Sequence, residues 1–431
     1  MNSEAGGGRA SAVAENIDSL KPGDIDLSDP DTFANGQPFE YYALLRREAP
    51  VLWQPPGSHL SNGMPIKQGF FVITKHADIA HISRSPRLFS SYAGGAFVGD
   101  PEEEDLAGMR AMLLNMDPPE HQKYRRLVGR GFTPRMIQEL EPKICAHAKR
   151  IVDEVADKGE CDFVDDLAVE LPLILICELM GVPEQDRRQV FSWANRLIGA
   201  DDPDMSPSAE DVKAAAIEMW MYSDRIAEEK KSSPDDTLVC KYVHGEVDGE
   251  RISQFQLNNF FLLLSVAGTE TTRNATTHAM RLFCANPDQY DLLRSDVDRY
   301  LPGAIEEVLR YSPSVIAFRR TATQDTELRG VKIRAGQKVV VYYPSGNRDE
   351  EVFDEPDRFD ITRSPNDHIT FGVGEHFCLG ANLARMQLRC ILREILTRLP
   401  DMEIAEPPRR ARNALVDAVK EMRVRFTPEA R

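Results

Sequence analysis

The sequence lacks three features: long apolar runs, a net positive charge, and a basic start followed by an apolar segment. Each of these marks a large class of protein, respectively membrane-spanning, nucleic-acid-binding and secreted proteins. Its longest apolar stretches, such as 260–266, fall well short of the roughly 20 residues that span a bilayer. The formal net charge of −17 argues against a nucleic-acid binder, which needs a basic face. The first thirty residues contain no basic segment followed by an apolar one, so no signal peptide is expected. These features favour a cytoplasmic protein with no membrane anchor.

Cysteine is scarce, with seven in 431 residues and none in a CxxC arrangement. An odd number in a cytosolic chain argues against a disulfide framework, and the scattered spacing argues against a zinc or iron–sulfur site. Most of the cysteines are therefore expected to be small buried hydrophobic residues. The seven are Cys145, Cys161, Cys177, Cys240, Cys284, Cys378 and Cys390.

The pattern of apolar residues predicts a single α-rich domain with small sheets. Residues 1–35 are rich in Gly, Ala, Ser and acidic side chains and are expected to form a loose tail, which leaves 36–431 as the domain. From about Pro134 to Cys284, apolar residues recur at spacings of three and four, as in helices. Shorter patterns predict strands at 51–55, 69–75, 326–344 and 421–427, and helices at 38–50, 303–312 and 381–399.

A long helix is predicted between Ser253 and Pro287. Ser253 and Gln256 fit a capping box, and Pro287 blocks continuation. Some 30 residues span about 45 Å, so the helix crosses the domain and its middle lies near the centre. That middle reads AGTETT, 267–272, where glycine costs up to about 1 kcal/mol relative to alanine and an acid needs partners. The segment is either a close-packing site with incidental polar groups or a functional one.

A glycine-rich loop surrounds one cysteine near the C-terminus. The segment FGVGEHFCLG, 371–380, fits FxxGxxxCxG, which chance would produce in a chain of this composition roughly once in a thousand. Its glycines allow a tight turn that brings backbone N–H groups towards the Cys378 sulfur. The helix predicted after the loop directs its positive end at that sulfur, which favours a thiolate. Such a cysteine suits a heme iron ligand, the alternative being a buried structural cysteine.

Four segments, taken in order, resemble the cytochrome P450 family of heme-thiolate monooxygenases, and the resemblance covers nearly everything after the tail. AGTETT matches the oxygen-activating segment of the family's central helix, and FGVGEHFCLG matches its cysteine loop. EEVLR supplies Glu307 and Arg310 at the ExxR positions, and FDITR supplies the meander arginine, Arg363. The resemblance implies a mainly α fold with small sheets, heme b between the long helix and the cysteine loop, and a structural Glu–Arg–Arg cluster.

The resemblance also assigns residues to the heme. Cys378 would be the axial ligand of the iron, with Phe371 at the start of its loop. Propionates need cationic or hydrogen-bonding side chains, and the implied set is His121 and Arg125 from MDPPEHQKYRR, His376 from the cysteine loop, and an arginine of FRRTA. Arg319 and Arg320 both stand in that last segment, and the match to RTATQDTELRG favours Arg320.

Within this resemblance the polar central segment acquires a chemical role. Gly268 leaves room for dioxygen beside the backbone, Thr271 places its hydroxyl near the bound oxygen, and Glu270 feeds protons to it. The thiolate favours O–O cleavage once protons arrive. A peroxygenase driven by hydrogen peroxide and a heme-binding sensor without turnover are the rival functions. The acid–alcohol pair argues against both.

Electrons and substrate are implied less specifically. The heme domain accounts for the chain, so electrons are expected from a ferredoxin and its NAD(P)H-dependent reductase. Arg385, Arg389 and Arg393 form a stripe that is either a solvated face or a docking patch for an acidic ferredoxin.

Several segments, such as AGTETTRNATTH and HFCLGANLAR, resemble the bacterial branch that hydroxylates steroid side chains, methyl-branched lipids and terpenoids. Thr269 replaces the asparagine common there. The resemblance favours hydroxylation of an unactivated carbon on an apolar small molecule, a terpenoid or steroid, with a fatty acid or alkyl chain as the alternative. Apolar residues at the family's pocket positions, which would also suit any core, are Val266, Ala267, Val315, Ile316 and Phe318.

Overall fold

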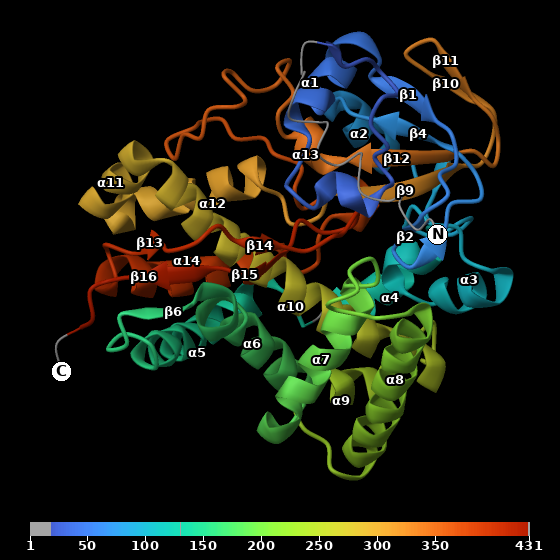
Figure 1. Ribbon diagram of the computed structural model, residues 1–431. Coiled ribbons are helices and arrows are strands. Elements are labelled where there is room, and N and C mark those ends of the chain that lie inside the picture. The colour runs from blue at the N-terminus through green and yellow to red at the C-terminus, as the bar shows by residue number, and fades with distance from the viewer. Residues whose placement is uncertain (1–18, 130, 430–431) are drawn as a thin grey trace, which may run out of the picture.

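A computed structural model describes residues 19–129 and 131–429, and it separates a large helical part from a smaller part built around a sheet (Figure 1). Helices of the sheet-containing part and its border are α1 (Phe39–Glu48), α2 (His76–Ser83), α3 (Glu103–Met109) and α13 (Tyr343–Gly346). The helical part comprises α4 (Glu120–Gly129), α5 (Pro134–Asp153), α6 (Glu170–Met180), α7 (Arg187–Ile198), α8 (Ala209–Ser232), α9 (Leu238–Val243), α10 (Gln254–Ala285), α11 (Pro287–Ser295), α12 (Val297–Tyr311) and α14 (Ala381–Arg398). A π-helix, η5 (Phe163–Ala168), precedes α6.

The main sheet has the strand order β1–β4–β12–β9–β5. Its strands are β1 (Val51–Gln54), β4 (Phe70–Ile73), β5 (Phe89–Ser90), β9 (Ala317–Ala322) and β12 (Lys338–Tyr342). β12 pairs parallel with β4 and antiparallel with β9. These pairings bring a strand from the N-terminal part of the chain next to the two strands that follow α12. The smaller sheets are β2 (Leu60–Ser61) with β3 (Met64–Pro65), β7 (Glu246–Val247) with β8 (Glu250–Arg251), β10 (Thr326–Leu328) with β11 (Val331–Ile333), β14 (Arg409–Arg410) with β15 (Val419–Glu421), and β13 (Glu403–Ile404) with β16 (Arg423–Arg425) and β6 (Glu160–Asp162).

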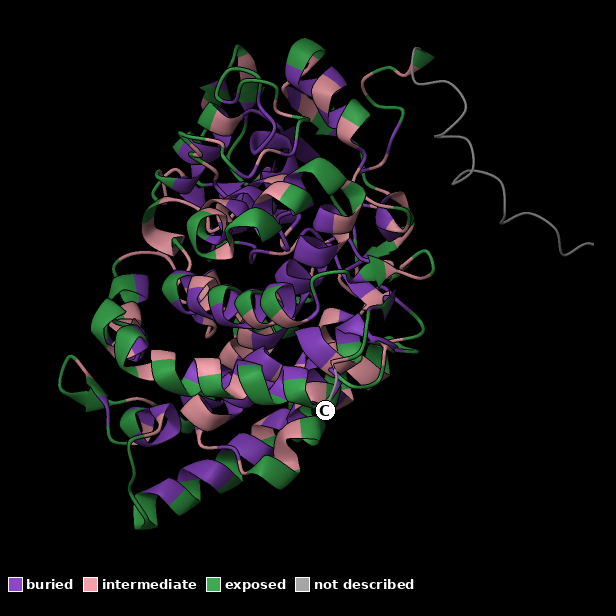
Figure 2. Ribbon diagram, turned by 90° about the vertical axis from the view of Figure 1, so that its left-hand side faces the viewer, coloured by how far each residue is buried: buried purple, intermediate pink, exposed green. Residues whose placement is uncertain are grey.

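The alternation of side chains along β12 builds a separate apolar core on each face of the main sheet. Val340 and Tyr342 pack on one face, whereas Val339 and Val341 pack on the other. The helical part has its own, larger core. Figure 2 shows buried residues concentrated inside both parts, with exposed residues on the outer faces of the helices. The predicted fold, mainly α with small sheets, is confirmed.

α10 has the ends that the sequence predicts. Ser253 N donates to Gln256 Oε1 at 3.0 Å and Gln256 N donates to Ser253 Oγ at 3.2 Å, so both halves of the capping box form. The helix ends at Ala285, two residues before Pro287. It packs against α6, α7, α8, α12 and α14 and runs through the middle of the helical part (Figure 1). The segment 267–272 therefore lies at the centre of the protein, as predicted.

Two sequence-based boundaries need correction. α12 begins at Val297 instead of after Pro302, because Asp296 caps it by accepting a hydrogen bond from Arg299 N and the proline is accommodated in the second turn. The expected tail, 1–35, is too long at its C-terminal end. Residues 1–18 lie outside the described residues, but Ile25 and Phe33 are buried in the core beside the main sheet. The composition of this segment did not reveal that these few apolar residues, which stand among polar neighbours, are buried.

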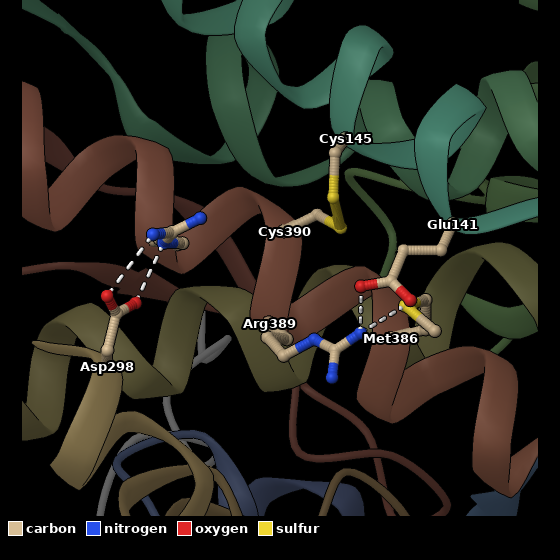
Figure 3. The surroundings of a disulfide bond; sticks show 7 residues. Glu141, Cys145, Asp298, Met386, Arg389 and Cys390 are labelled. Carbon is tan, nitrogen blue, oxygen red and sulfur yellow. Dashed lines mark hydrogen bonds and ion pairs between the residues drawn. A yellow bond between two sulfur atoms is a disulfide. The ribbon is translucent and has the colours of Figure 1, made fainter. Parts of the chain in front are cut away.

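The expectation that the cysteines form no disulfide is wrong for one pair. Cys145 of α5 and Cys390 of α14 are bonded to each other (Figure 3). They stand 245 residues apart, so no spacing in the sequence signals the contact, which arises because α5 packs directly on α14. Among the free cysteines, Cys161, Cys177 and Cys240 are buried as expected, and Cys284 and Cys378 are half-buried. No described helix has both the length and the apolar character needed to cross a membrane.

Candidate functional site

The cysteine loop turns tightly around the Cys378 sulfur. Cys378 N donates to Phe371 O at 2.8 Å, and Gly374 has a φ of 75°. A Cβ atom at Gly374 would lie 2.7 Å from Ser83 O, so only glycine fits there. Burial raises the pKa of the Cys378 thiol, although the Gly380 N–H and the cations Arg125 and Arg385 act in the opposite direction. In the protein alone burial outweighs these donors, and a thiolate needs a positive partner such as an iron.

Two histidines from distant parts of the chain lie against each other beside this loop. The rings of His121, on α4, and His376 have centroids 4.2 Å apart. Burial lowers the pKa of His121 to about 4 and that of His376 to about 2, so both rings are neutral at pH 7. Both ring nitrogens of His121 are buried and lack a hydrogen-bond partner among the described residues. A buried imidazole in that state calls for a partner, and a propionate would supply one.

The two candidate arginines of β9 differ in their surroundings. Arg319 pairs with Asp100, with Nη1 and Oδ1 3.0 Å apart. Arg320 is 5% exposed, donates from Nη1 to the Arg319 carbonyl at 2.7 Å, and forms no ion pair with any described residue. Beside burial, its charge lowers the pKa values of both His121 and His376. Arg125 Nη2 donates to Phe377 O at 2.5 Å, which brings a second cation to the cysteine loop.

The Glu–Arg–Arg contacts implied by the resemblance are formed. Arg310 donates two hydrogen bonds of 2.8 and 2.7 Å to Glu307, and both side chains are fully buried. Arg363 Nε lies 3.3 Å from Glu307 Oε1. Asn366 Nδ2 and Asp360 N also donate to Glu307. Both arginines donate further to backbone carbonyls of the segment 347–358, which lies before the cysteine loop. The cluster thus binds α12 to this irregular segment.

The central segment of α10 presents a few accessible residues within a buried helix. Ala267 is exposed and Thr271 is half-buried, whereas Thr272 is buried. Thr271 Oγ1 donates to Ala267 O at 2.8 Å, as a threonine in a helix often does. A Cβ at Gly268 would lie 3.0 Å from Ile176 Cδ1 of α6, so this glycine permits the two helices to pack closely. Ile176 fills the space on the side where that Cβ would stand. Glu270 is fully buried next to Arg273.

The pocket candidates fall into two groups. Val266, Val315 and Phe318 are partly buried, and Ala267 is exposed, so these four have accessible surface. Ile316 has none, because it packs in the core beside the main sheet with residues such as Tyr342. We therefore leave Ile316 out of the pocket.

The arginine stripe of α14 is neutralised by acids. Arg385 forms two 2.7 Å hydrogen bonds with Glu306, and Arg393 pairs with Asp298. Arg389 pairs with Glu141 (Figure 3). Burial would raise the pKa of Glu306, but hydrogen bonds from Arg385 and His368 bring it down to about 2. These acids are supplied by other elements, so the sequence of α14 alone does not reveal them.

Comparison with known proteins identifies the family of this chain. The cytochrome P450 family model matches residues 190–406. The chain is 40% identical over 424 residues to a steroid C26-monooxygenase of Rhodococcus jostii (strain RHA1), which covers 97% of this chain and 88% of the relative. This chain belongs to the cytochrome P450 family. It is therefore a monooxygenase, an oxidoreductase of a family that works with a heme iron.

Other P450s agree with this assignment over nearly the same length. A methyl-branched lipid omega-hydroxylase of Mycobacterium tuberculosis (strain ATCC 25618 / H37Rv) is 36% identical, covering 97% of this chain and 100% of the relative. The crystal structure of Mycobacterium marinum cytochrome P450 CYP268A2 in complex with pseudoionone superposes with a TM-score of 0.86 at 38% identity, covering 95% of this chain and all of the other.

The residues present fit the heme that the P450 family carries. Cys378 has a backbone donor and two cations near its sulfur, the buried nitrogens of His121 lack hydrogen bonds among the described residues, and Arg320 has no carboxylate partner among them. This donor set matches a metal ligand and the holders of two carboxylate groups. Contacts of His121 with His376 and of Arg125 with the Phe377 carbonyl join α4 to the cysteine loop.

The assignment of Arg320 over Arg319 leads to a prediction about heme affinity. Arg320→Ala should weaken heme binding roughly 10- to 100-fold, since a hydrogen bond to a charged group contributes about 1.5–3 kcal/mol. Arg319→Ala should leave heme affinity nearly unchanged, because Arg319 is committed to Asp100. Transfer of heme to apomyoglobin measures both variants. A larger loss in Arg319→Ala would reverse the assignment.

Proposed function

We propose that this P450 hydroxylates an unactivated carbon of a steroid or terpenoid, with Cys378 as the axial ligand of a heme b. The observation that carries the ligand assignment is the convergence of His121, Arg125, Arg320 and His376 on the Cys378 loop. Heme, when bound, supplies the iron that activates dioxygen. The chain's own residues hold its propionates, supply the thiolate, and bring protons and substrate to the oxygen.

Thr271 and Glu270 are the proposed proton donors. Thr271 is the accessible hydroxyl of the segment and lies one helical turn from the exposed Ala267, on the face that would meet the oxygen. Glu270 is fully buried. Protons can therefore reach its carboxyl group only through neighbouring groups. A positioned acid and alcohol together act as a general-acid relay.

Replacement of these residues should affect the use of oxygen more than heme content. Thr271→Ala should still consume NAD(P)H but release much of the oxygen as hydrogen peroxide, because the second proton is misdirected. Glu270→Ala should slow turnover, because the proton supply is cut. Thr272→Ala is the matched control, since Thr272 is buried and its hydroxyl is rotated about 100° from Thr271.

The ratio of product to NAD(P)H consumed tests this relay. Uncoupling in Thr272→Ala but not in Thr271→Ala would show that the wrong hydroxyl has been assigned. Full coupling in all three variants would reduce the segment to a packing site.

The substrate class rests on the relatives and on the accessible apolar residues. The relatives include a steroid C26-monooxygenase and a methyl-branched lipid omega-hydroxylase, and CYP268A2 binds pseudoionone, an isoprenoid ketone. Val266, Ala267, Val315 and Phe318 give the proposed pocket an apolar lining. Spectral titration with sterols, terpenoids and fatty acids should give the tightest binding with the first two. Tightest binding of unbranched fatty acids would favour the alternative substrate class.

We further propose that a ferredoxin and its NAD(P)H-dependent reductase supply the electrons. The P450 relatives align with nearly the whole chain, so the matched region is the heme domain itself. A surrogate ferredoxin pair with NAD(P)H should support product formation. Turnover with hydrogen peroxide alone would indicate a peroxygenase instead.

A further inference from the structure

A short segment after α12, residues 312–316, is fastened to α10 beside the proposed proton donor Thr271. Ser314 Oγ donates to the backbone carbonyl of Thr271 at 2.7 Å. The next residue, Val315, is partly buried and is one of the pocket candidates. The place of this part of the pocket wall relative to Thr271 therefore depends on how the segment 312–316 is held.

A second segment, the turn 413–417 between β14 and β15, holds the first one in place. The two segments meet in an antiparallel bridge between Val315 and Val416. A backbone hydrogen bond stands on either side of this bridge, from Asp417 N to Ser314 O at 2.9 Å and from Ile316 N to Leu415 O at 2.8 Å. Because these contacts flank Val315, the two segments form one unit, and a shift of the turn would carry Val315 with it.

His278 of α10 binds the turn through its imidazole ring. It stands seven residues, about two turns, after Thr271 and therefore lies on the same face of the helix. The side chain is fully buried, and its Nε2 lies 2.8 Å from Asp417 O. Burial lowers the pKa of His278 to about 4, so the ring is neutral at pH 7 and carries one N–H. A carbonyl oxygen only accepts, so that N–H is at Nε2 and donates to the turn.

The other ring nitrogen connects His278 to the first segment. Its Nδ1 accepts from Arg281 Nε at 3.3 Å, and Arg281 Nη2 donates to Ser312 Oγ at 3.0 Å. The Asp417 carboxylate pairs with Arg410, which leaves the Asp417 carbonyl to His278. His278 therefore binds the turn directly and reaches the first segment through one arginine.

We propose that His278 is a positioning residue for the hydroxylation. Through Asp417 it fixes Val315 at a set place relative to Thr271, and this place decides which carbon of the substrate meets the oxygen. His278 has no exposed surface, so it acts through the turn and not by contact with the substrate. The inference rests on the proposed hydroxylase function. A histidine that merely fills the core would stabilise the fold without affecting the site of oxidation.

Two substitutions that differ by one methylene isolate the hydrogen bond to the turn. His278→Asn keeps an acceptor for Arg281 but is too short to reach the Asp417 carbonyl, whereas His278→Gln is long enough to donate to it. Thr277→Val is the matched control, since Thr277 is a buried neighbour whose hydroxyl donates within α10 to Arg273 O at 3.0 Å. His278→Phe removes both bonds but keeps the volume, and it gives the same comparison if the cavity left by asparagine prevents folding.

Hydrogen–deuterium exchange measures the hold on the turn without any substrate. In His278→Asn, the amide hydrogens of Asp417 and Ile316 should exchange about 2- to 10-fold faster, the factor that corresponds to one hydrogen bond. His278→Gln and Thr277→Val should exchange these amides at the wild-type rate. Unchanged exchange in His278→Asn and His278→Phe would overturn the proposal.

The ratio of products tests the consequence for the reaction. Pseudoionone is the flexible isoprenoid probe, and testosterone is the rigid steroid probe. For each probe that the wild type hydroxylates, the ratio of the product alcohols should change about 2- to 10-fold in His278→Asn. The ratio should stay at the wild-type value in His278→Gln and Thr277→Val. Melting temperature and heme content are measured for every variant, because a loss of stability alone would leave the ratio unchanged.

The outcomes distinguish this inference from the function on which it rests. If the wild type hydroxylates neither probe, the proposed function fails and the inference fails with it. If the wild type hydroxylates a probe and His278→Asn shows faster exchange but the same product ratio, only the inference is overturned and His278 is a structural residue.

Discussion

Glu307→Ala should yield protein that is largely insoluble or free of heme. The substitution strands Arg310, which is fully buried, and removes an acceptor from Arg363, Asn366 and the Asp360 N–H. Breaking a buried pair by removing one partner costs about 3–5 kcal/mol, a large share of the roughly 5–15 kcal/mol that keeps a protein folded. The loss should loosen the segment 347–358 that leads towards the cysteine loop.

The ratio of heme absorbance to protein and the melting temperature measure this effect. Glu139→Ala is the matched control, since Glu139 pairs with Arg135 on the surface, where such pairs contribute about 0–1 kcal/mol. It should retain normal heme content and stability. A Glu307→Ala protein that is well folded, loaded with heme and inactive would instead make Glu307 catalytic.

Cys378→Ser should abolish the thiolate-type spectrum of the reduced carbon monoxide complex. A serine hydroxyl is far less acidic than a thiol and cannot supply the same anionic sulfur ligand, so the electronic effect on the iron is lost. Cys284→Ser is the control, because Cys284 is a free, half-buried thiol that donates to the Met402 carbonyl at 3.6 Å. Cys390 is unsuitable, since its replacement would also break the disulfide with Cys145. A thiolate spectrum that survives in Cys378→Ser would refute the ligand assignment.

Local signals in the sequence predicted the features that local physics controls. The ends of α10 follow from Ser253, Gln256 and Pro287, because a capping box and a proline act within one turn. The turn around Cys378 follows from the glycines beside it, since no residue with a Cβ fits against Ser83 at position 374. These features need no knowledge of what packs nearby.

Features that depend on distant neighbours were not predictable in the same way. Strand alternation puts Arg319 and Arg320 on opposite faces of β9, but only Asp100 shows which of the two is already paired. The Cys145–Cys390 bond depends on how α5 lies on α14. In the sequence, Arg273 is one more polar residue of α10. Its hydrogen bond to Asn195 is visible only in the structure.

Product formation under ¹⁸O₂ tests the central claim most directly. Heme-loaded protein with a surrogate ferredoxin, its reductase, NAD(P)H and the best-binding sterol or terpenoid should form an alcohol that carries one labelled oxygen atom. The second atom should appear in water. Unlabelled product, or product formed only when hydrogen peroxide is added, would contradict the assignment of this chain as a dioxygen-dependent hydroxylase.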